Sequence, residues 1–190
     1  MKLRYSRAGG LAAVLVAAAV GAIPAVTPAH ASAAPTVAVV RAAPQNLGYS
    51  YTYSTGMTWP QTMLQTPSSV ATAVANDFRR YFTFDSDCPK LPPVGGVCNL
   101  YFTPFIANPV QVLARSSTSF TFISLPGHAE GAGRVITFTF YKTGLDPFGD
   151  IRLHAAASGP YTVAADLTIR SGAAFTMWRT FATNVGRAFG

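Results

Sequence analysis

The chain has 190 residues, of which 49% are hydrophobic and 11% are charged, with 14 Lys and Arg against 7 Asp and Glu. This length, with no internal repeat, predicts one domain and excludes a solenoid. Arg79-Arg80 is the only adjacent basic pair, and no apolar run after the N-terminal region is long enough to span a membrane. We therefore expect neither nucleic-acid binding nor a transmembrane segment in the mature chain.

The N-terminus has the three parts of a secretory signal peptide. Met1–Arg7 carries three basic residues, Leu11–Val26 is almost wholly apolar, and small residues follow. Gly21 and Pro24 interrupt the apolar run, which argues against an uncleaved anchor. We predict that residues 1–33 are removed and that the protein is secreted by the general export route. The mature chain then keeps 11 basic residues against 7 acids, a net charge of +4.

The first half of the mature chain predicts a flexible leader, a strand and a helix. Residues 34–48 show little pattern, whereas Tyr49–Ser54 alternates aromatic with small polar residues, which is typical of a half-buried strand. Thr66 followed by Pro67 is a helix start signal, so we predict a helix over Pro67–Phe82. Its apolar positions recur every fourth residue: Val70, Val74, Phe78 and Phe82. The exposed face should carry Arg79-Arg80.

Two cysteines, Cys88 and Cys98, flank a stretch rich in Pro and Gly that reads as a loop. A secreted chain with two cysteines most simply pairs them, so we predict a disulfide that holds this loop in one shape. A metal site is the alternative, but the loop offers no histidine or third cysteine to complete it.

The central part of the chain predicts a series of short antiparallel strands. Extended runs with period-2 patterning lie at Leu100–Phe105, Val110–Ala114, Ser119–Leu125, Arg134–Lys142, Ile151–Ala157 and Thr162–Arg170. Phe138 and Phe140 share one face of their strand, and His154 shares a face with Arg152, opposite Ile151. Regular spacing of this kind is typical of antiparallel meanders.

The end of the chain changes to a helical period, from Ser171 or Ala173 to Ala188. One face carries Phe175, Trp178, Phe181, Ala182, Val185 and Phe189. We predict an α+β fold over residues 49–190, in which a curved antiparallel sheet packs on the long C-terminal helix. A β-barrel with flanking helices is the alternative.

The aromatic residues of the sheet and the terminal helix have two interpretations. Aromatic residues on one face of a helix usually belong to the hydrophobic core. Where a curved sheet packs around the helix, the same face can instead line an apolar cavity. The candidate ligand-binding residues are Phe138, Phe140, Phe175, Trp178 and Phe181.

The loop Leu125–Gly133, LPGHAEGAG, holds the candidate catalytic pair, His128 and Glu130, the only glutamate of the chain. A carboxylate near an imidazole can orient it as a general base. The alternative is a glycine-bounded hairpin connection in which both side chains are solvated or cap backbone groups. A metal site would require His128 and His154 to converge with Asp150 or Glu130, and their spacing is no metal-binding signature.

The segment Asn108–Pro160 resembles an uncharacterised bacterial and plant family whose members carry a Thr-Leu-Pro-Gly-His-Pro-Glu-rich turn. The matching piece is Phe122–Gly131, with Ser124 in place of the family's Thr and Ala129 in place of its Pro. That family is similar to START-like, helix-grip (SRPBCC) domains. The resemblance implies a helix-grip fold with an apolar cavity for lipids, polyketides or other hydrophobic ligands.

Three functions are consistent with these observations. The first is an exported, non-catalytic START-like module that binds a hydrophobic small molecule or lipid. The second is a secreted hydrolase or cyclase that uses His128 and Glu130 as an acid–base pair, and the third is a cell-envelope interaction protein. We expect no cofactor and no bound metal, and we expect a monomer.

Overall fold

The computed structural model describes residues 45–144 and 149–189, all of which belong to a compact unit spanning Arg41–Gly190. The predicted signal peptide and the leader as far as residue 44 lie outside the described residues. The predicted first strand begins earlier than expected, at Asn46.

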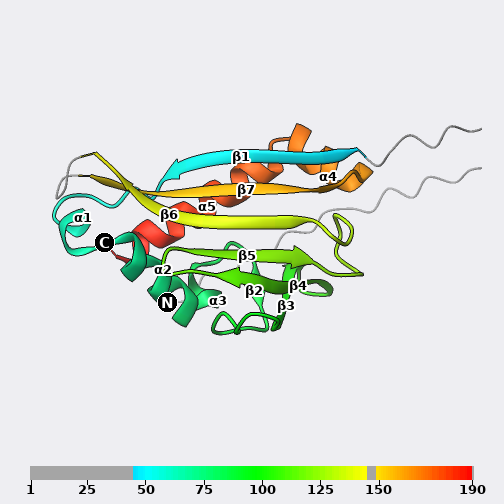
Figure 1. The fold of residues 1–190 in the computed structure, drawn as a ribbon, viewed down its shortest axis with the longest axis horizontal. Helices are drawn as coiled ribbons and strands as arrows, with labels where there is room; N and C mark the ends of the chain where they lie inside the picture. Colours follow the sequence, from blue (N-terminus) through cyan, green and yellow to red (C-terminus); the bar gives the residue numbers. More distant parts are fainter. Residues whose placement is uncertain (1–44, 145–148, 190) are drawn as a thin grey trace, which may run out of the picture. The chain divides into compact units, whose positions relative to one another are not determined.

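Within the described residues, seven antiparallel strands form one sheet in the order β1-β7-β6-β5-β4-β3-β2 (Figure 1). The strands are β1 (Asn46–Ser54), β2 (Asp85–Ser86), β3 (Val97–Thr103), β4 (Ile106–Arg115), β5 (Ser119–Ser124), β6 (Val135–Thr143) and β7 (Asp150–Pro160). From β2 to β7, each strand pairs with the next one in the sequence. The first strand, β1, pairs with the last, β7. The register shifts near Tyr101 in β3 and Val112 in β4, and such irregularities bend a sheet.

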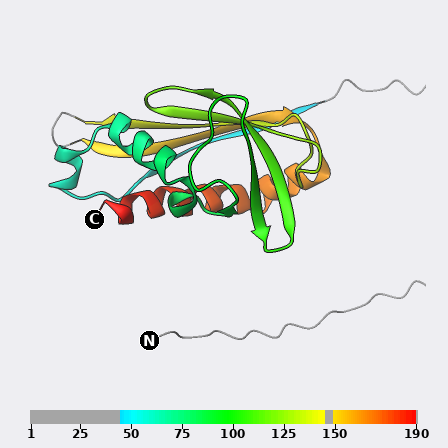
Figure 2. The same ribbon diagram turned by 90° about the horizontal axis from the view of Figure 1, so that it is seen from below.

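The part of the chain that the structure describes also contains five helices: α1 (Gln61–Leu64), α2 (Pro67–Asn76), α3 (Phe78–Tyr81), α4 (Val163–Arg170) and α5 (Ala173–Ala188). Figure 2 shows α2 and α5 on the same face of the sheet. The predicted α+β fold, a curved antiparallel sheet with the C-terminal helix packed against it, is therefore confirmed, and the sheet is open rather than closed into a barrel. In the described part of the chain, no helix combines the length and apolar character needed to cross a membrane.

The helix predicted over Pro67–Phe82 is interrupted at Asp77. Its start is as predicted, because the Thr66 hydroxyl accepts the Ser69 N–H and the Ser69 hydroxyl accepts the Thr66 N–H. At Asp77 the backbone leaves the helical region, with φ −140° and ψ 54°. The Ala75 carbonyl accepts the Leu91 N–H (2.7 Å) from the loop that follows, which explains why the helical ladder does not continue.

The strand predicted over Thr162–Arg170 is wrong, because this segment forms α4. Thr162 acts as the N-cap, its hydroxyl accepting the Ala165 N–H at 3.1 Å. Asp166 pairs with Arg170 four residues later at 2.8 Å, a spacing that places both side chains on one face of a helix. Both signals were in the sequence, but the β-branched residues of the segment suggested a strand.

The core lies between the concave face of the sheet and the helices, and most of it is aromatic. Its fully buried rings are Phe78, Phe120, Phe122, Phe138, Phe140 and Phe181. Near the C-terminal end of α5, Gly186 packs directly on the backbone of Thr55, the residue that follows β1. A Cβ at Gly186 would overlap the Thr55 carbonyl oxygen, so only glycine permits this close approach.

Candidate ligand-binding site

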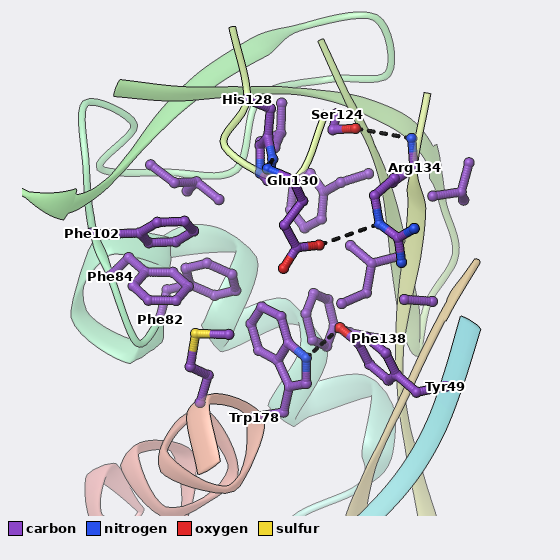
Figure 3. A pocket seen from close by; sticks show the side chains of 17 residues that line it. Tyr49, Phe82, Phe84, Phe102, Ser124, His128, Glu130, Arg134, Phe138 and Trp178 are labelled. Carbon is purple, nitrogen blue, oxygen red and sulfur yellow. Dashed lines mark hydrogen bonds and ion pairs between the residues drawn. The ribbon is translucent and has the colours of Figure 1, made fainter. Parts of the chain in front are cut away.

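A small cavity lies between the sheet and the N-terminal half of α5, with a volume of about 60 Å³ (Figure 3). Most of its lining is apolar and aromatic. The rings of this wall are Phe82, Phe84, Phe102, Phe122, Phe138 and Trp178. The polar side chains that line it are Tyr49, Ser124, His128, Glu130 and Arg134. A mostly apolar cavity with a few convergent polar groups is the usual form of a small-molecule site.

The aromatic wall comes from β3, β5, β6, α5 and the segment between α3 and β2. Trp178 of α5 meets Phe138 of β6 edge to face, with ring centroids 4.9 Å apart. Phe84 meets Phe102 of β3, with ring centroids 4.1 Å apart. Phe102 is 41% exposed, whereas Phe138 is fully buried, so Phe102 marks the side on which the cavity approaches the surface.

The connection between β5 and β6 carries the polar end of the cavity and is held by its own hydrogen bonds. The Ser124 hydroxyl donates to the Gly131 carbonyl (2.7 Å) and accepts the Arg134 N–H (2.9 Å). Gly131 has φ +90°, a conformation that glycine adopts without strain. The Thr162 hydroxyl donates to the Glu130 carbonyl at 2.8 Å, which ties the connection to the start of α4.

Glu130 and Arg134 form an ion pair that is largely removed from solvent. Arg134 Nε lies 3.3 Å from Glu130 Oε2, and the two side chains are 5% and 19% exposed. Arg134 also donates to the Pro160 carbonyl (2.9 Å) and the Leu47 carbonyl (3.3 Å), so it joins the connection to β7 and β1. Burial raises the pKa of Glu130, although Arg134 and the Thr168 hydroxyl act in the opposite direction.

His128 is not coupled to the Glu130 carboxylate as a catalytic dyad requires. Its Nδ1 accepts the backbone N–H of Glu130 at 3.2 Å, and within the described residues no hydrogen bond joins the ring to the carboxylate. Burial, and then the positive charge of Arg134, lowers the pKa of His128. A neutral ring that accepts at Nδ1 carries its proton on Nε2, which makes Nε2 a donor.

Across the cavity, Tyr49 of β1 is bonded to Trp178 of α5. The Trp178 Nε1–H donates to the Tyr49 hydroxyl at 2.6 Å. Burial raises the pKa of Tyr49, so the phenol is neutral under ordinary conditions and keeps its own O–H. This bond fixes the Trp178 ring against the cavity.

The five aromatic residues predicted to bind a ligand occupy different places. Phe138 and Trp178 line the cavity. Phe140 and Phe181 are buried in the core and do not line it, and Phe175 is 40% exposed and packs against tyrosines of β1. The structure therefore brings together Phe138 and Trp178 with both members of the predicted catalytic pair.

Most residues that line the cavity were not predicted as site residues, among them Tyr49, Phe84, Phe102, Ser124 and Arg134. Arg134 had a usable signal, because it is the only basic residue next to the LPGHAEGAG loop and lies four residues after its glutamate. Tyr49 had only the general pattern of a half-buried strand, which says nothing about a partner on α5.

His154 lies away from the cavity, on the face of β7 opposite Leu153, where its Nε2 is 2.8 Å from the Ser50 hydroxyl. It does not join His128 in a metal site. Within residues 45–144 and 149–189, the one group of potential metal ligands is Asp87, Cys88 and Cys98.

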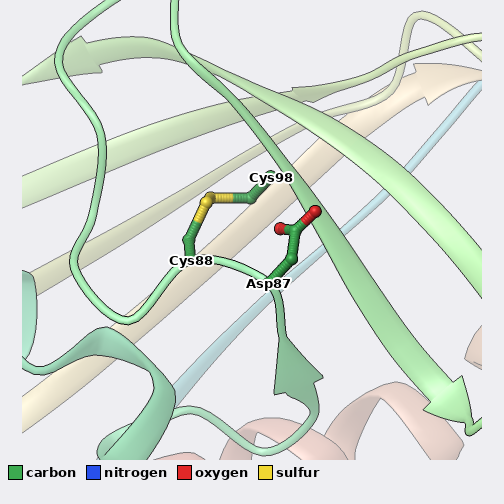
Figure 4. A group of neighbouring side chains, drawn as sticks. All are labelled: Asp87, Cys88 and Cys98. Atoms are coloured by element: carbon green, nitrogen blue, oxygen red, sulfur yellow. A yellow bond between two sulfur atoms is a disulfide. The ribbon is translucent and has the colours of Figure 1, made fainter.

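Cys88 and Cys98 are joined in the predicted disulfide, with their Cα atoms 5.7 Å apart (Figure 4). Their sulfur atoms are thus not available as metal ligands. The neighbouring Asp87 carboxylate accepts the backbone N–H (2.8 Å) and the side-chain N–H (2.7 Å) of Asn99 in β3. The bridge and these hydrogen bonds together fasten the loop to β3.

The Cys88→Ala/Cys98→Ala double variant is expected to have a free energy of unfolding about 2 kcal/mol lower, without loss of the fold. The bridge closes a short loop, and the aromatic core does not depend on it. Urea denaturation of the oxidised protein and the double variant measures the difference. Two free thiols per chain in denatured, unreduced protein would contradict the disulfide.

Acid is expected to destabilise the protein through His128. Because its folded pKa lies below the ordinary value of 6.5, the unfolded state binds more protons between these two pKa values. The stability contribution is present above the ordinary pKa and is lost as the pH falls through the folded one. The raised pKa of Glu130 acts the other way, costing stability as the pH rises through its own window.

The measurement is the free energy of unfolding of wild type and His128→Gln from about pH 7.5 down to pH 5. Wild type should lose more stability than the variant over this range. Parallel curves would contradict the lowered pKa, and an NMR titration of the His128 ring protons provides an independent check.

No protein-family model matches the chain, and no curated protein matches it. Solved structures do resemble it. The protein XoxI from Bacillus cereus is 12% identical, with 76% of this chain and 94% of that protein covered and a TM-score of 0.52. A likeness at this identity shows a shared fold and no more.

Two further structures are similar over a comparable length. MLL2253 from Mesorhizobium loti is 18% identical over 75% of this chain and 95% of its own, with a TM-score of 0.49. The Aha1 dimer from Colwellia psychrerythraea is 11% identical over 75% of this chain and 98% of its own, with a TM-score of 0.48.

Proposed function

We propose that this chain is an exported, non-catalytic START-like module that binds a small hydrophobic ligand between the sheet and α5. The observation that carries the proposal is the aromatic cavity with a confined set of polar groups. Apolar walls provide the affinity for such a ligand, and a few polar groups fix its orientation.

The hydrogen bonding of His128 favours binding over catalysis. Its Nδ1 is engaged by the Glu130 backbone, and the Glu130 carboxylate is engaged by Arg134. The acid–base pair of a hydrolase or cyclase would require the carboxylate to orient the ring or both groups to be free for proton transfer. These residues instead form a rigid polar end to an apolar space.

The volume of the cavity limits the ligand. An apolar cavity of about 150 Å³ takes up benzene, and 60 Å³ is smaller. A ring can therefore enter only when side chains at the mouth move. Met177 and Phe102 are suited to this, because methionine is unbranched and flexible and the Phe102 ring is 41% exposed. Side-chain rearrangements of this kind are common on binding.

The test uses Trp178 as a reporter. The chain has two tryptophans, and Trp59 is 63% exposed, so Trp59→Phe leaves Trp178 alone. We expect saturable changes in its fluorescence on titration with p-cresol or p-xylene, two aromatic probes of equal size. Native mass spectrometry of protein recovered from the growth medium of its own host tests both the export and the natural ligand.

A matched pair of variants on β7 localises the binding. Ala157 lines the cavity, whereas its neighbour Ala156 points to the opposite face of the sheet. Ala157→Leu fills the cavity and should abolish the response of Trp178, and Ala156→Leu should preserve it. If neither probe changes the Trp178 signal in the Trp59→Phe protein, the cavity is not a ligand site.

A further inference from the structure

The polar side chains of the cavity differ in what they still have to offer a ligand. Arg134 is committed to protein partners, because it donates to two backbone carbonyls and pairs with Glu130. Its charge is compensated within the protein. An anionic ligand would meet the Glu130 carboxylate beside it, so the cavity is not built for an anion.

Glu130 retains acceptor capacity toward the cavity. A carboxylate has about four acceptor positions, and Arg134 and Thr168 use only part of them. Figure 3 shows the oxygen that is not paired with Arg134 directed toward the space beside the Trp178 ring.

Tyr49 retains a donor. Its hydroxyl oxygen accepts the Trp178 N–H, and among the described residues no acceptor binds its own hydrogen. His128 provides the second donor of the cavity. Because its Nδ1 accepts the Glu130 N–H, the proton of the neutral ring is on Nε2. Among the polar side chains that line the cavity, one acceptor and two donors therefore remain available to a ligand.

We propose that the ligand carries a neutral hydroxyl group on an apolar ring, with the hydroxyl donating to Glu130 and accepting from Tyr49 or His128. This inference rests on the proposed function. A hydroxyl is both donor and acceptor, so it satisfies both kinds of group at once. A carbonyl group can only accept and an ammonium group can only donate, and a hydrocarbon leaves the remaining positions on Glu130, Tyr49 and His128 unused.

The experiment compares p-cresol with p-xylene, in which a methyl group replaces the hydroxyl, and with 4-methylbenzoate as the anion. The readout is the indole N–H signal of Trp178 in ¹⁵N NMR spectra, with the exposed Trp59 as internal reference. We expect p-cresol to bind at least about tenfold more tightly than p-xylene, corresponding to roughly one good hydrogen bond.

Two variants should reduce this preference, and one should not. Tyr49→Phe removes the donor and Glu130→Gln alters the acceptor, so both are expected to lower the ratio of the two affinities severalfold. Tyr51→Phe removes a hydroxyl from the same strand outside the cavity and should leave the ratio unchanged. If Glu130→Gln does not fold, the result for Tyr49→Phe decides.

The outcomes separate the two proposals. Saturable binding of both probes with equal affinity would overturn the hydroxyl preference and leave the binding function intact. Tightest binding of 4-methylbenzoate would also overturn it, because Arg134 would then be available to an anion. No response of Trp178 to any probe would overturn both proposals.

Discussion

Replacing Phe181 with alanine is expected to lower the free energy of unfolding by about 3–5 kcal/mol. The ring is fully buried and lies at the centre of the contact between α5 and the sheet. Its centroid is 5.1 Å from that of Phe82 and 5.3 Å from that of Phe138. The substitution leaves a void that these rings, held by their own neighbours, fill only in part.

Phe175→Ala on the same helix is the matched control. Because Phe175 is 40% exposed, its loss should cost about 1 kcal/mol. Urea denaturation with far-UV circular dichroism gives both values. Equal losses in the two variants would mean that the aromatic core between α5 and the sheet is not packed as described.

Replacing Arg134 with methionine is expected to lower the free energy of unfolding by about 3 kcal/mol near pH 7. The variant leaves the Glu130 carboxylate, 19% exposed, without its counter-charge, and it breaks the hydrogen bonds to Pro160 and Leu47. The loss should shrink as the pH falls through the pKa of Glu130, because the protonated side chain carries no charge.

The Glu130→Gln/Arg134→Met double variant separates the two causes. If the uncompensated charge dominates, the double variant should be more stable than Arg134→Met alone at neutral pH, and this difference should shrink as the pH falls through the pKa of Glu130. A deficit in Arg134→Met that is unchanged between about pH 7 and pH 4.5 would contradict the ion pair as its source.

Most of the fold could be predicted because local patterns and tertiary burial agree along the strands. Phe138 and Phe140, for example, alternate with polar residues in the sequence and are both buried in the sheet. The helix α5 was predictable for the same reason, since the part of its apolar stripe from Trp178 to Val185 is buried against the core.

The failures lie where local signals compete. In α4, only Ala165 is buried, so no apolar stripe marks the helix, and its β-branched residues resemble a strand. At Asp77 the apolar period continues across the break, because α3 keeps Phe78 buried although the backbone changes direction. The spacing of apolar residues indicates which side chains are buried, but it does not indicate whether the backbone between them is one continuous helix.

The candidate site could be predicted only in part because its residues come from distant segments. Tyr49 and Trp178 are 129 positions apart, and they meet because β1 pairs with β7 at the edge of the sheet. No local pattern in either segment specifies that pairing. The loop with His128 and Glu130 was conspicuous because its residue types are rare in this chain, which is a chemical signal rather than a structural one.

The glycine contact at the C-terminal half of α5 determines which shapes the cavity can take. Because Gly186 rests on the Thr55 backbone, that end of the helix cannot move closer to the sheet, and its packing against β1 holds it in place. Expansion is then confined to the end with Met177 and Trp178, next to the exposed ring of Phe102. A long acyl chain laid along the helix would have to separate it from the sheet at Gly186, whereas a short, ring-sized molecule would not. For the ligand proposed above, the Gly186 contact would limit the length, at a position remote from the polar groups of the cavity.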